Sequence, residues 1–148
     1  MSKGTVSAYD DLIAAADQDY AQGRYKDAHI KYGRAVSCGT ARNDYCRQMR
    51  GICSRHVAEE RMQLAVDNPD LRRPYLDQAA RWLAKSEANL NSAFDESPEL
   101  QLGHIRLEQA RTEEAIARFM EMCGGDPGRR LSVANSYRQE GLELLANA

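Results

Sequence analysis

The pattern of apolar and polar positions along the chain is helical throughout. Apolar residues recur three and four positions apart, and no run alternates apolar and polar residues for long enough to form a strand. We therefore predict an all-α fold. The spacing predicts about seven antiparallel helices with short connections, over residues 7–22, 25–37, 42–67 and 71–95, two within 98–123, and 128–146.

Turn residues divide this pattern. Gly23 is placed to take the left-handed conformation that ends the first helix, and Gly39 with Thr40 interrupts the chain before the third. Asp67-Asn68-Pro69 and Gly124-Gly125-Asp126-Pro127 are further breaks. Because 148 residues suit one core, we expect a single domain.

The segment 98–123 is interpreted as a hairpin. Ala110-Arg111-Thr112 has the character of a turn that ends in an N-cap, and Glu113 and Glu114 would supply the negative charge that favours a first helical turn. The predicted domain, 1–148, then consists of a hairpin 7–37, a long helix pair 42–95, a hairpin 98–123 and a capping helix 128–146. The capping helix is expected to turn one stripe inward, namely Leu131, Ala134, Tyr137, Leu142 and Leu145.

Composition and charge narrow the class of protein. A formal net charge of −2 gives no electrostatic reason to expect nucleic acid. No apolar run approaches the roughly 20 residues that span a bilayer, and the N-terminal sequence lacks the apolar core of a signal peptide. We therefore expect a cytoplasmic protein that binds neither nucleic acid nor membrane.

Candidate chemistry is sparse. Cys46, Cys53 and His56 lie on one apolar helical stripe, where a metal site is conceivable but core packing is the simpler interpretation. None of the three histidines follows a Glu by three positions, and no glycine-flanked serine or phosphate-binding glycine loop is present. We expect no enzyme activity, no metal and no cofactor.

One helical-hairpin signature occurs twice. A turn residue is followed by an acid and a small alanine, then by an aromatic residue one helical turn later. The first copy consists of Gly23, Tyr25, Ala28, Tyr32 and Ala35, and the second of Ala110, Ala115, Phe119 and Met122. The alanine lets a neighbouring helix approach, and the aromatic side chain fills the adjacent gap on the same face.

These residues resemble the tetratricopeptide repeat, a 34-residue helix pair. The segment 98–127 is similar through Leu102-Gly103, Ala115, Phe119 and Asp126-Pro127, and the segment 9–37 through its second helix, with Ala15-Ala16 where the family has Leu-Gly. The helices 42–67 and 71–95 are longer than the family's. The resemblance implies a tetratricopeptide-like array with an elongated central pair.

Residues 8–66 also resemble microtubule-interacting-and-trafficking domains, which are three-helix bundles with a closely similar hairpin. Both families imply docking of a peptide or a partner helix in a groove between helices. We therefore expect a non-catalytic adaptor or scaffold for protein–protein interaction.

The tetratricopeptide register implies which residues line that groove. They are Ile13, Asp17 and Tyr20 on the first helix and Leu100, His104 and Leu107 on the helix after Pro98. Packing of the same residues against the long central helices is the alternative.

A second hypothesis is a self-associating structural or regulatory subunit of a larger assembly. Copies would meet through the long helices 42–67 and 71–95, with surplus apolar side chains such as Trp82 exposed. The partner would then be a homo-oligomer.

Overall fold

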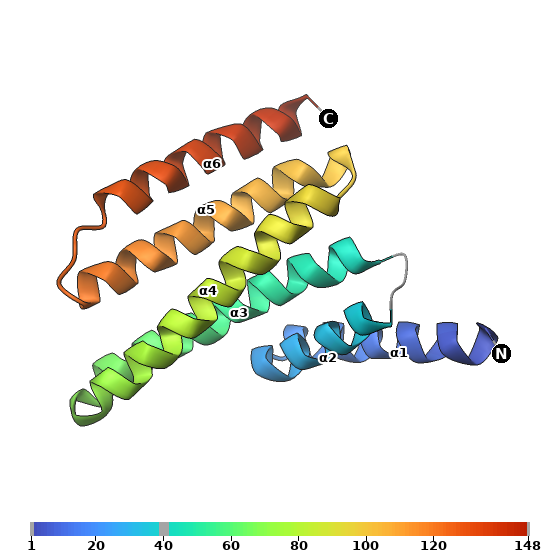
Figure 1. Ribbon diagram of the computed structural model, residues 1–148, viewed down its shortest axis with the longest axis horizontal. Helices are drawn as coiled ribbons and strands as arrows, with labels where there is room; N and C mark the ends of the chain where they lie inside the picture. Colours follow the sequence, from blue (N-terminus) through green and yellow to red (C-terminus); the bar gives the residue numbers. More distant parts are fainter. Residues whose placement is uncertain (1, 39–41, 148) are drawn as a thin grey trace.

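A computed structural model describes residues 2–38 and 42–147, with side chains from residue 9 onward. Within these residues there are six α-helices, a short 3-10 helix and no strand, which confirms the all-α fold. The predicted break at Gly39 and Thr40 lies outside the described residues. The elements are α1 (Ser2–Ala21), α2 (Tyr25–Ser37), α3 (Asn43–Asp67), η1 (Pro69–Leu71), α4 (Arg72–Glu96), α5 (Glu99–Met122) and α6 (Gly128–Ala146) (Figure 1).

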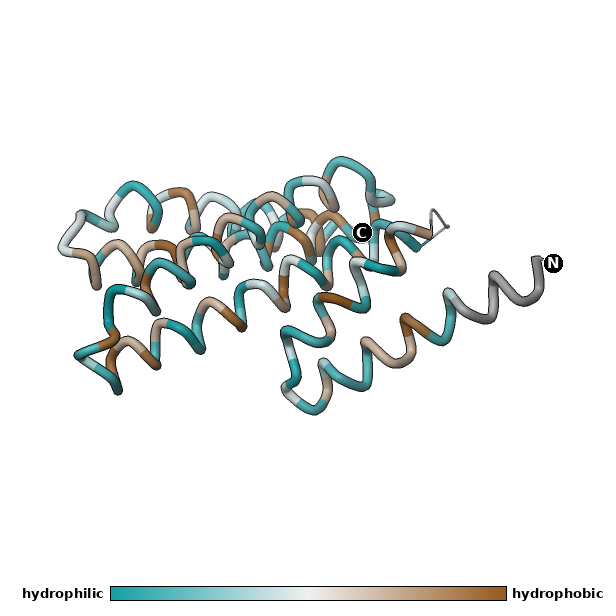
Figure 2. Tube along the Cα trace, turned by 60° about the horizontal axis from the view of Figure 1, so that its bottom comes forward, coloured by the Kyte–Doolittle hydropathy of each residue, from teal (hydrophilic) through white to brown (hydrophobic). Residues whose placement is uncertain are grey.

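The helices form three successive hairpins, α1/α2, α3/α4 and α5/α6. Each hairpin packs on the next, because α2 also contacts α3 and α4 also contacts α5 (Figure 1). Hydrophobic and hydrophilic residues are interspersed along the coloured parts of the helices, as expected for helices with one buried face (Figure 2). No helix in the described part of the chain is long and apolar enough to cross a membrane.

Two glycines end helices in the left-handed conformation. Gly23 follows α1 with φ of 77°, and Gly124 follows α5 with φ of 81°. The residue after each glycine donates its backbone N–H back to the preceding helix, Arg24 to the Asp19 carbonyl and Gly125 to the Met120 carbonyl, both at 2.8 Å. The predicted left-handed Gly23 is confirmed.

The N-terminal core is built from α1, α2 and α3. Ala28 and Tyr32 of the first signature are both 0% exposed in it. The other buried members are Tyr9, Ile13, Ala16, Ala35, Cys46 and Cys53. Ala115 of the second signature is also buried, in a smaller cluster with Ala58 of α3 and Leu83 of α4.

The predicted hairpin within 98–123 is wrong, because α5 is one continuous helix from Glu99 to Met122. Thr112 does not cap a helix. It is 1% exposed, and its Oγ1 lies 2.9 Å from the Ser86 Oγ of α4. Glu113 accepts a hydrogen bond from Arg130 of α6 at 2.9 Å. Thr112 and Glu113, which were expected to begin a helix, therefore lie inside α5 and contact neighbouring helices. The chain therefore has six α-helices in its described part, not seven.

The predicted inward stripe of the last helix is confirmed in part. Ala134 is buried, and Tyr137 and Leu145 are half-buried, but Leu131 and Leu142 are 41% and 55% exposed, while Gly141, outside the predicted stripe, is buried. Gly141 lies against Gly103 of α5, so closely that a Cβ on Gly141 would be 2.9 Å from the Gly103 carbonyl oxygen. This close approach of two backbones sets the face that α6 turns to α5.

Candidate functional site: the furrow between α3 and α5

The side chains of α3 and α5 enclose two hollows, one toward each end of the pair. Residues 45–49 of α3 share the first hollow with residues 101–111 of α5, and residues 59–66 share the second with residues 118–122. The two helices therefore run parallel. We call the two hollows and the ion pairs between them the α3–α5 furrow.

The first hollow has a volume of about 280 Å³. Tyr45 and Met49 of α3 face Leu107 of α5 across it, and His104 is an exposed residue of its wall. The rest of the lining is polar or charged and consists of Gln48, Gln101, Glu108 and Arg111. A hollow lined by apolar and polar residues together suits an amphipathic segment of a partner.

Asp17 of α1 fixes one wall of this hollow. Its Oδ1 accepts hydrogen bonds from the hydroxyl groups of Tyr32 and Tyr45, the latter at 2.6 Å. Burial, followed by the bond to Asp17, raises the pKa of Tyr45 to about 12, so this phenol remains a neutral donor. Asp17 therefore positions Tyr45 instead of offering its own carboxylate to a partner.

Tyr20 joins the first hairpin to α3. Its ring lies edge-on to Tyr25 at 5.5 Å and to His56 at 6.0 Å, while His56 stacks on Tyr25 with ring centres 4.2 Å apart. Burial and then the nearby Glu108 raise the pKa of Tyr20. Burial lowers the pKa of His56, which favours a neutral stacked ring.

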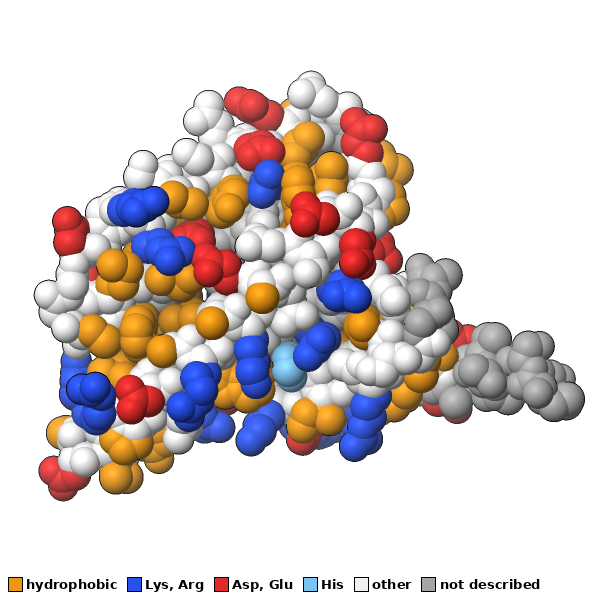
Figure 3. All heavy atoms as spheres, in the orientation of Figure 1, with side chains coloured by type: hydrophobic (Ala, Val, Ile, Leu, Met, Phe, Trp, Pro, Cys, Tyr) orange, Lys and Arg blue, Asp and Glu red, His pale blue; other side chains and the backbone are white. Residues whose placement is uncertain are grey.

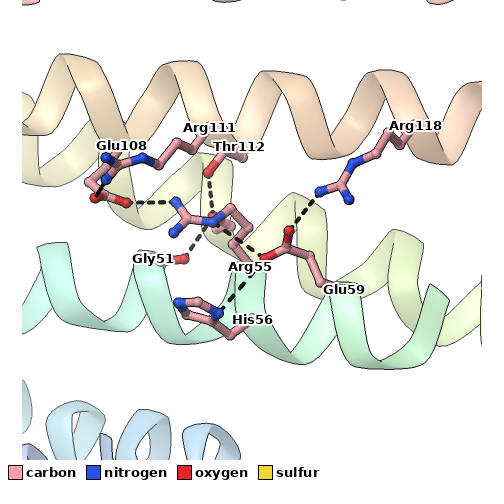
Figure 4. A network of polar contacts seen from close by, with 9 residues as sticks. Gly51, Arg55, His56, Glu59, Glu108, Arg111, Thr112 and Arg118 are labelled. Atoms are coloured by element: carbon pink, nitrogen blue, oxygen red, sulfur yellow. Dashed lines mark hydrogen bonds and ion pairs between the residues drawn. The ribbon is translucent and has the colours of Figure 1, made fainter. Parts of the chain in front are cut away.

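A band of ion pairs joins α3 to α5 (Figure 4). Arg55 of α3, whose side chain is 7% exposed, donates to Glu108 of α5 at 2.6 Å and lies 3.7 Å from Glu59. Arg118 of α5 pairs with the other oxygen of Glu59 at 2.6 Å, and Arg111 pairs with Glu108. Each carboxylate is shared by two guanidinium groups, and the three arginines and two glutamates of the band carry a formal charge of +1.

The second hollow, of about 240 Å³, repeats the pattern of the first. Its apolar residues are Met62, Val66 and Met122, and its polar residues are Glu59, Gln63, Arg118 and Glu121. Val66 is 56% exposed, so this end of the furrow presents apolar surface to solvent.

The six residues predicted to line a groove lie in different parts of the structure. His104 and Leu107 line the first hollow, and Asp17 supports its wall through Tyr45. Tyr20 packs against Tyr25 and His56 and lines neither hollow. Ile13 is 1% exposed in the N-terminal core, so it has no surface to offer a partner. Leu100 is 68% exposed but does not line either hollow.

Tyr45 and Met49 of α3 and Glu108 of α5 are not among the residues predicted to line a groove, and Arg111 is predicted to lie in a turn. The signal that could have found them is topological: in an array of hairpins, the first helix of the middle hairpin must lie between the first helices of its neighbours. Because the segment 42–67 is longer than the first helix of a tetratricopeptide repeat, its sequence does not indicate that it occupies this position.

A further hollow of about 620 Å³ lies between the start of α4 and the end of α5. Leu76, Phe119 and Met122 form its apolar part, and Arg72 bridges it by donating to the Met122 carbonyl oxygen. In Figure 3, hydrophobic side chains with Lys and Arg around them gather where α4 begins and α5 ends. Only Met122 is shared with the furrow.

The cysteine and histidine stripe of α3 is part of the packing. Cys46 and Cys53 are 0% exposed, and burial raises the pKa of Cys53 to about 12. Among the residues described, no three or more His, Cys, Asp or Glu side chains are grouped closely enough to hold a metal ion.

Comparison of the chain with known protein families, with curated proteins and with solved structures gave no match.

Proposed function

We propose that this protein is a non-catalytic adaptor that docks an amphipathic helix of a partner protein in the α3–α5 furrow. The observation that carries the proposal is the pairing of two hollows, each with three apolar lining residues, at the two ends of a band of ion pairs. The tetratricopeptide resemblance of the sequence favours the same kind of activity.

The furrow suggests the form of the partner segment. The described residues contain no strand, so a partner segment has no sheet edge to which it could add as a strand. A furrow between two parallel helices instead suits a third helix. Met49 and Met62, one from each hollow, are 13 positions apart, and this spacing corresponds to about 20 Å along α3. A partner helix would place two apolar anchors about four turns apart with polar residues between them.

Two side chains of the furrow are held in place before binding. Asp17 holds Tyr45, and Glu108 holds the little-exposed Arg55, so these two side chains have little freedom to lose on binding. A single furrow of this kind would give a Kd in the micromolar range.

The test combines cross-linking with a direct binding assay. A photo-reactive residue replaces Gln48 in the first hollow, Gln63 in the second hollow or, as a control, the exposed Gln139 of α6. We expect the residues at 48 and 63 to cross-link to one and the same partner segment. The synthetic segment should then bind with an affinity reduced at least about tenfold in the Gln48→Glu/His104→Glu variant. The matched control, Ser136→Glu/Gln139→Glu on α6, should bind as wild type does.

Both double variants add two negative charges at positions with accessible side chains, and circular dichroism should confirm equal helical content. Equal binding by the two variants, or cross-links confined to Gln139, would refute docking in the furrow.

Self-association is a second candidate function, through α6 instead of the long helices 42–67 and 71–95. Trp82 is only partly exposed, because it packs edge-on against His29 with ring centres 5.1 Å apart. The observation that favours it is instead the exposed pair Leu131 and Leu142, which lie three turns apart on α6. Sedimentation that depends on concentration and is abolished by Leu142→Glu would support this function.

A further inference from the structure

A second polar cluster lies where α2, α3 and α4 meet, and none of its residues lines the furrow. His29 of α2 is 7% exposed, and Trp82 of α4 covers its ring. The Lys85 Nζ lies 4.4 Å from the centre of the Trp82 ring. Arg50 of α3 packs on Gly33, one turn after His29, where a Cβ would be 3.4 Å from the Arg50 Nε.

The two cations of this cluster lack counter-charges. Among the residues described, no carboxylate forms an ion pair with Arg50 or Lys85, whereas the neighbouring Arg47 lies 3.1 Å from Glu96. The Nε of Arg50 and the Nε2 of His29 are buried without a hydrogen-bond partner in the described chain. Lys85 is exposed and Arg50 is half-buried, so the buried polar atoms of the cluster that have no partner are the Nε of Arg50 and the Nε2 of His29. Buried polar atoms are normally hydrogen-bonded, so these two atoms could accommodate a ligand.

The electrostatics agree with this geometry. Burial, followed by Arg50 and Lys85, lowers the pKa of His29 to about 4, so the imidazole is neutral at pH 7. Burial and then Arg47 lower the pKa of Arg50. The cluster thus holds two positive charges over a neutral aromatic floor. Lys and Arg side chains gather over α2 and α4 in the lower half of Figure 3.

We propose that Arg50 and Lys85 bind a phosphate dianion, free or as the phosphate group of a small monoester, above a floor formed by His29 and Trp82. The charge of a dianion balances the two cations, which a monoanionic carboxylate does not. The guanidinium fork of Arg50 suits two phosphate oxygens, and the ammonium group of Lys85 can donate to a third.

Trp82 is the single tryptophan of the chain, so its fluorescence reports directly on the site. Titration with inorganic phosphate and, separately, with O-phosphoserine at constant ionic strength should give saturable changes. The affinity should fall at least about tenfold in Arg50→Gln and in Lys85→Gln, as expected for loss of a charged hydrogen bond. The control Arg129→Gln, on the exposed start of α6, should bind as wild type does.

His29 supplies an independent readout. Its pKa, followed through the ring resonances, should rise when phosphate is bound, because an anion offsets the two cations. Saturation by inorganic phosphate assigns the site to the free anion, and saturation by O-phosphoserine alone assigns it to a monoester.

Changes that fail to saturate, that equal those produced by acetate, or that are the same in Arg50→Gln and Arg129→Gln would overturn the proposal. Because neither Arg50 nor Lys85 lines the furrow, this result is independent of the docking experiment.

Discussion

Replacing Gly141 with alanine tests the close approach of α5 and α6. A Cβ at this position would lie 2.9 Å from the backbone oxygen of Gly103, 3.1 Å from Arg106 Cβ and 3.1 Å from Leu107 Cδ2. The nearest of these atoms belongs to the backbone of another helix and cannot move aside without shifting α5. The two helices must therefore separate by a few tenths of an ångström.

Two opposing effects determine how much Gly141→Ala changes the free energy of unfolding. Alanine improves intrinsic helix propensity by about 1 kcal/mol relative to glycine. Overpacking costs about 1–3 kcal/mol, and a backbone contact places Gly141→Ala toward the upper end, at about 2–3 kcal/mol. The net effect is a loss of about 1–2 kcal/mol in the free energy of unfolding, or a decrease of about 2–8 °C in Tm for a chain of this size.

The assay is thermal and urea unfolding followed by circular dichroism. Gly33→Ala in α2 is the matched control, since a Cβ there meets only the flexible side chain of Arg50, at 3.4 Å and beyond. This control should gain up to about 1 kcal/mol from helix propensity alone. If Gly141→Ala were stabilised as much as Gly33→Ala, the inferred contact between α5 and α6 would be wrong.

The remaining predictions concern titration and reactivity. In a buffer free of phosphate, stability should fall as pH decreases from about 6.5 toward 4, because His29 is protonated in the unfolded chain but stays neutral in the fold, where its pKa is about 4. Urea unfolding at pH 4.5 and 7 should show a smaller difference for His29→Gln than for wild type, and equal differences would contradict the assignment. A thiol reagent should modify the exposed Cys38 and Cys123 rapidly and the buried Cys46 and Cys53 only after unfolding. Rapid modification of a third thiol in the native protein would show that the α3 packing is more open than described.

The candidate site was predictable in part. His104 and Leu107 line the same hollow because their spacing follows one helix face, which is a local property. Ile13 shares that local character, yet it is 1% exposed because α2 and α3 cover its side of α1. Whether an apolar residue lines a hollow or fills a core depends on which neighbour reaches it, and no spacing along one helix contains that information.

Helical periodicity, breakers and caps were sufficient for the all-α class and most helix ends, because they act within one or two turns of the chain. Gly23 ends α1 for such a local reason. Long-range contacts settled the rest. The Oγ1 of Thr112 lies 2.9 Å from the Oγ of Ser86, and α5 continues through Thr112, the residue that resembled an N-cap. Gly141 meets Gly103 and thereby sets the rotation of α6. The free energy of such contacts depends on atoms far apart in sequence, so the α3–α5 furrow exists only once the hairpins have packed.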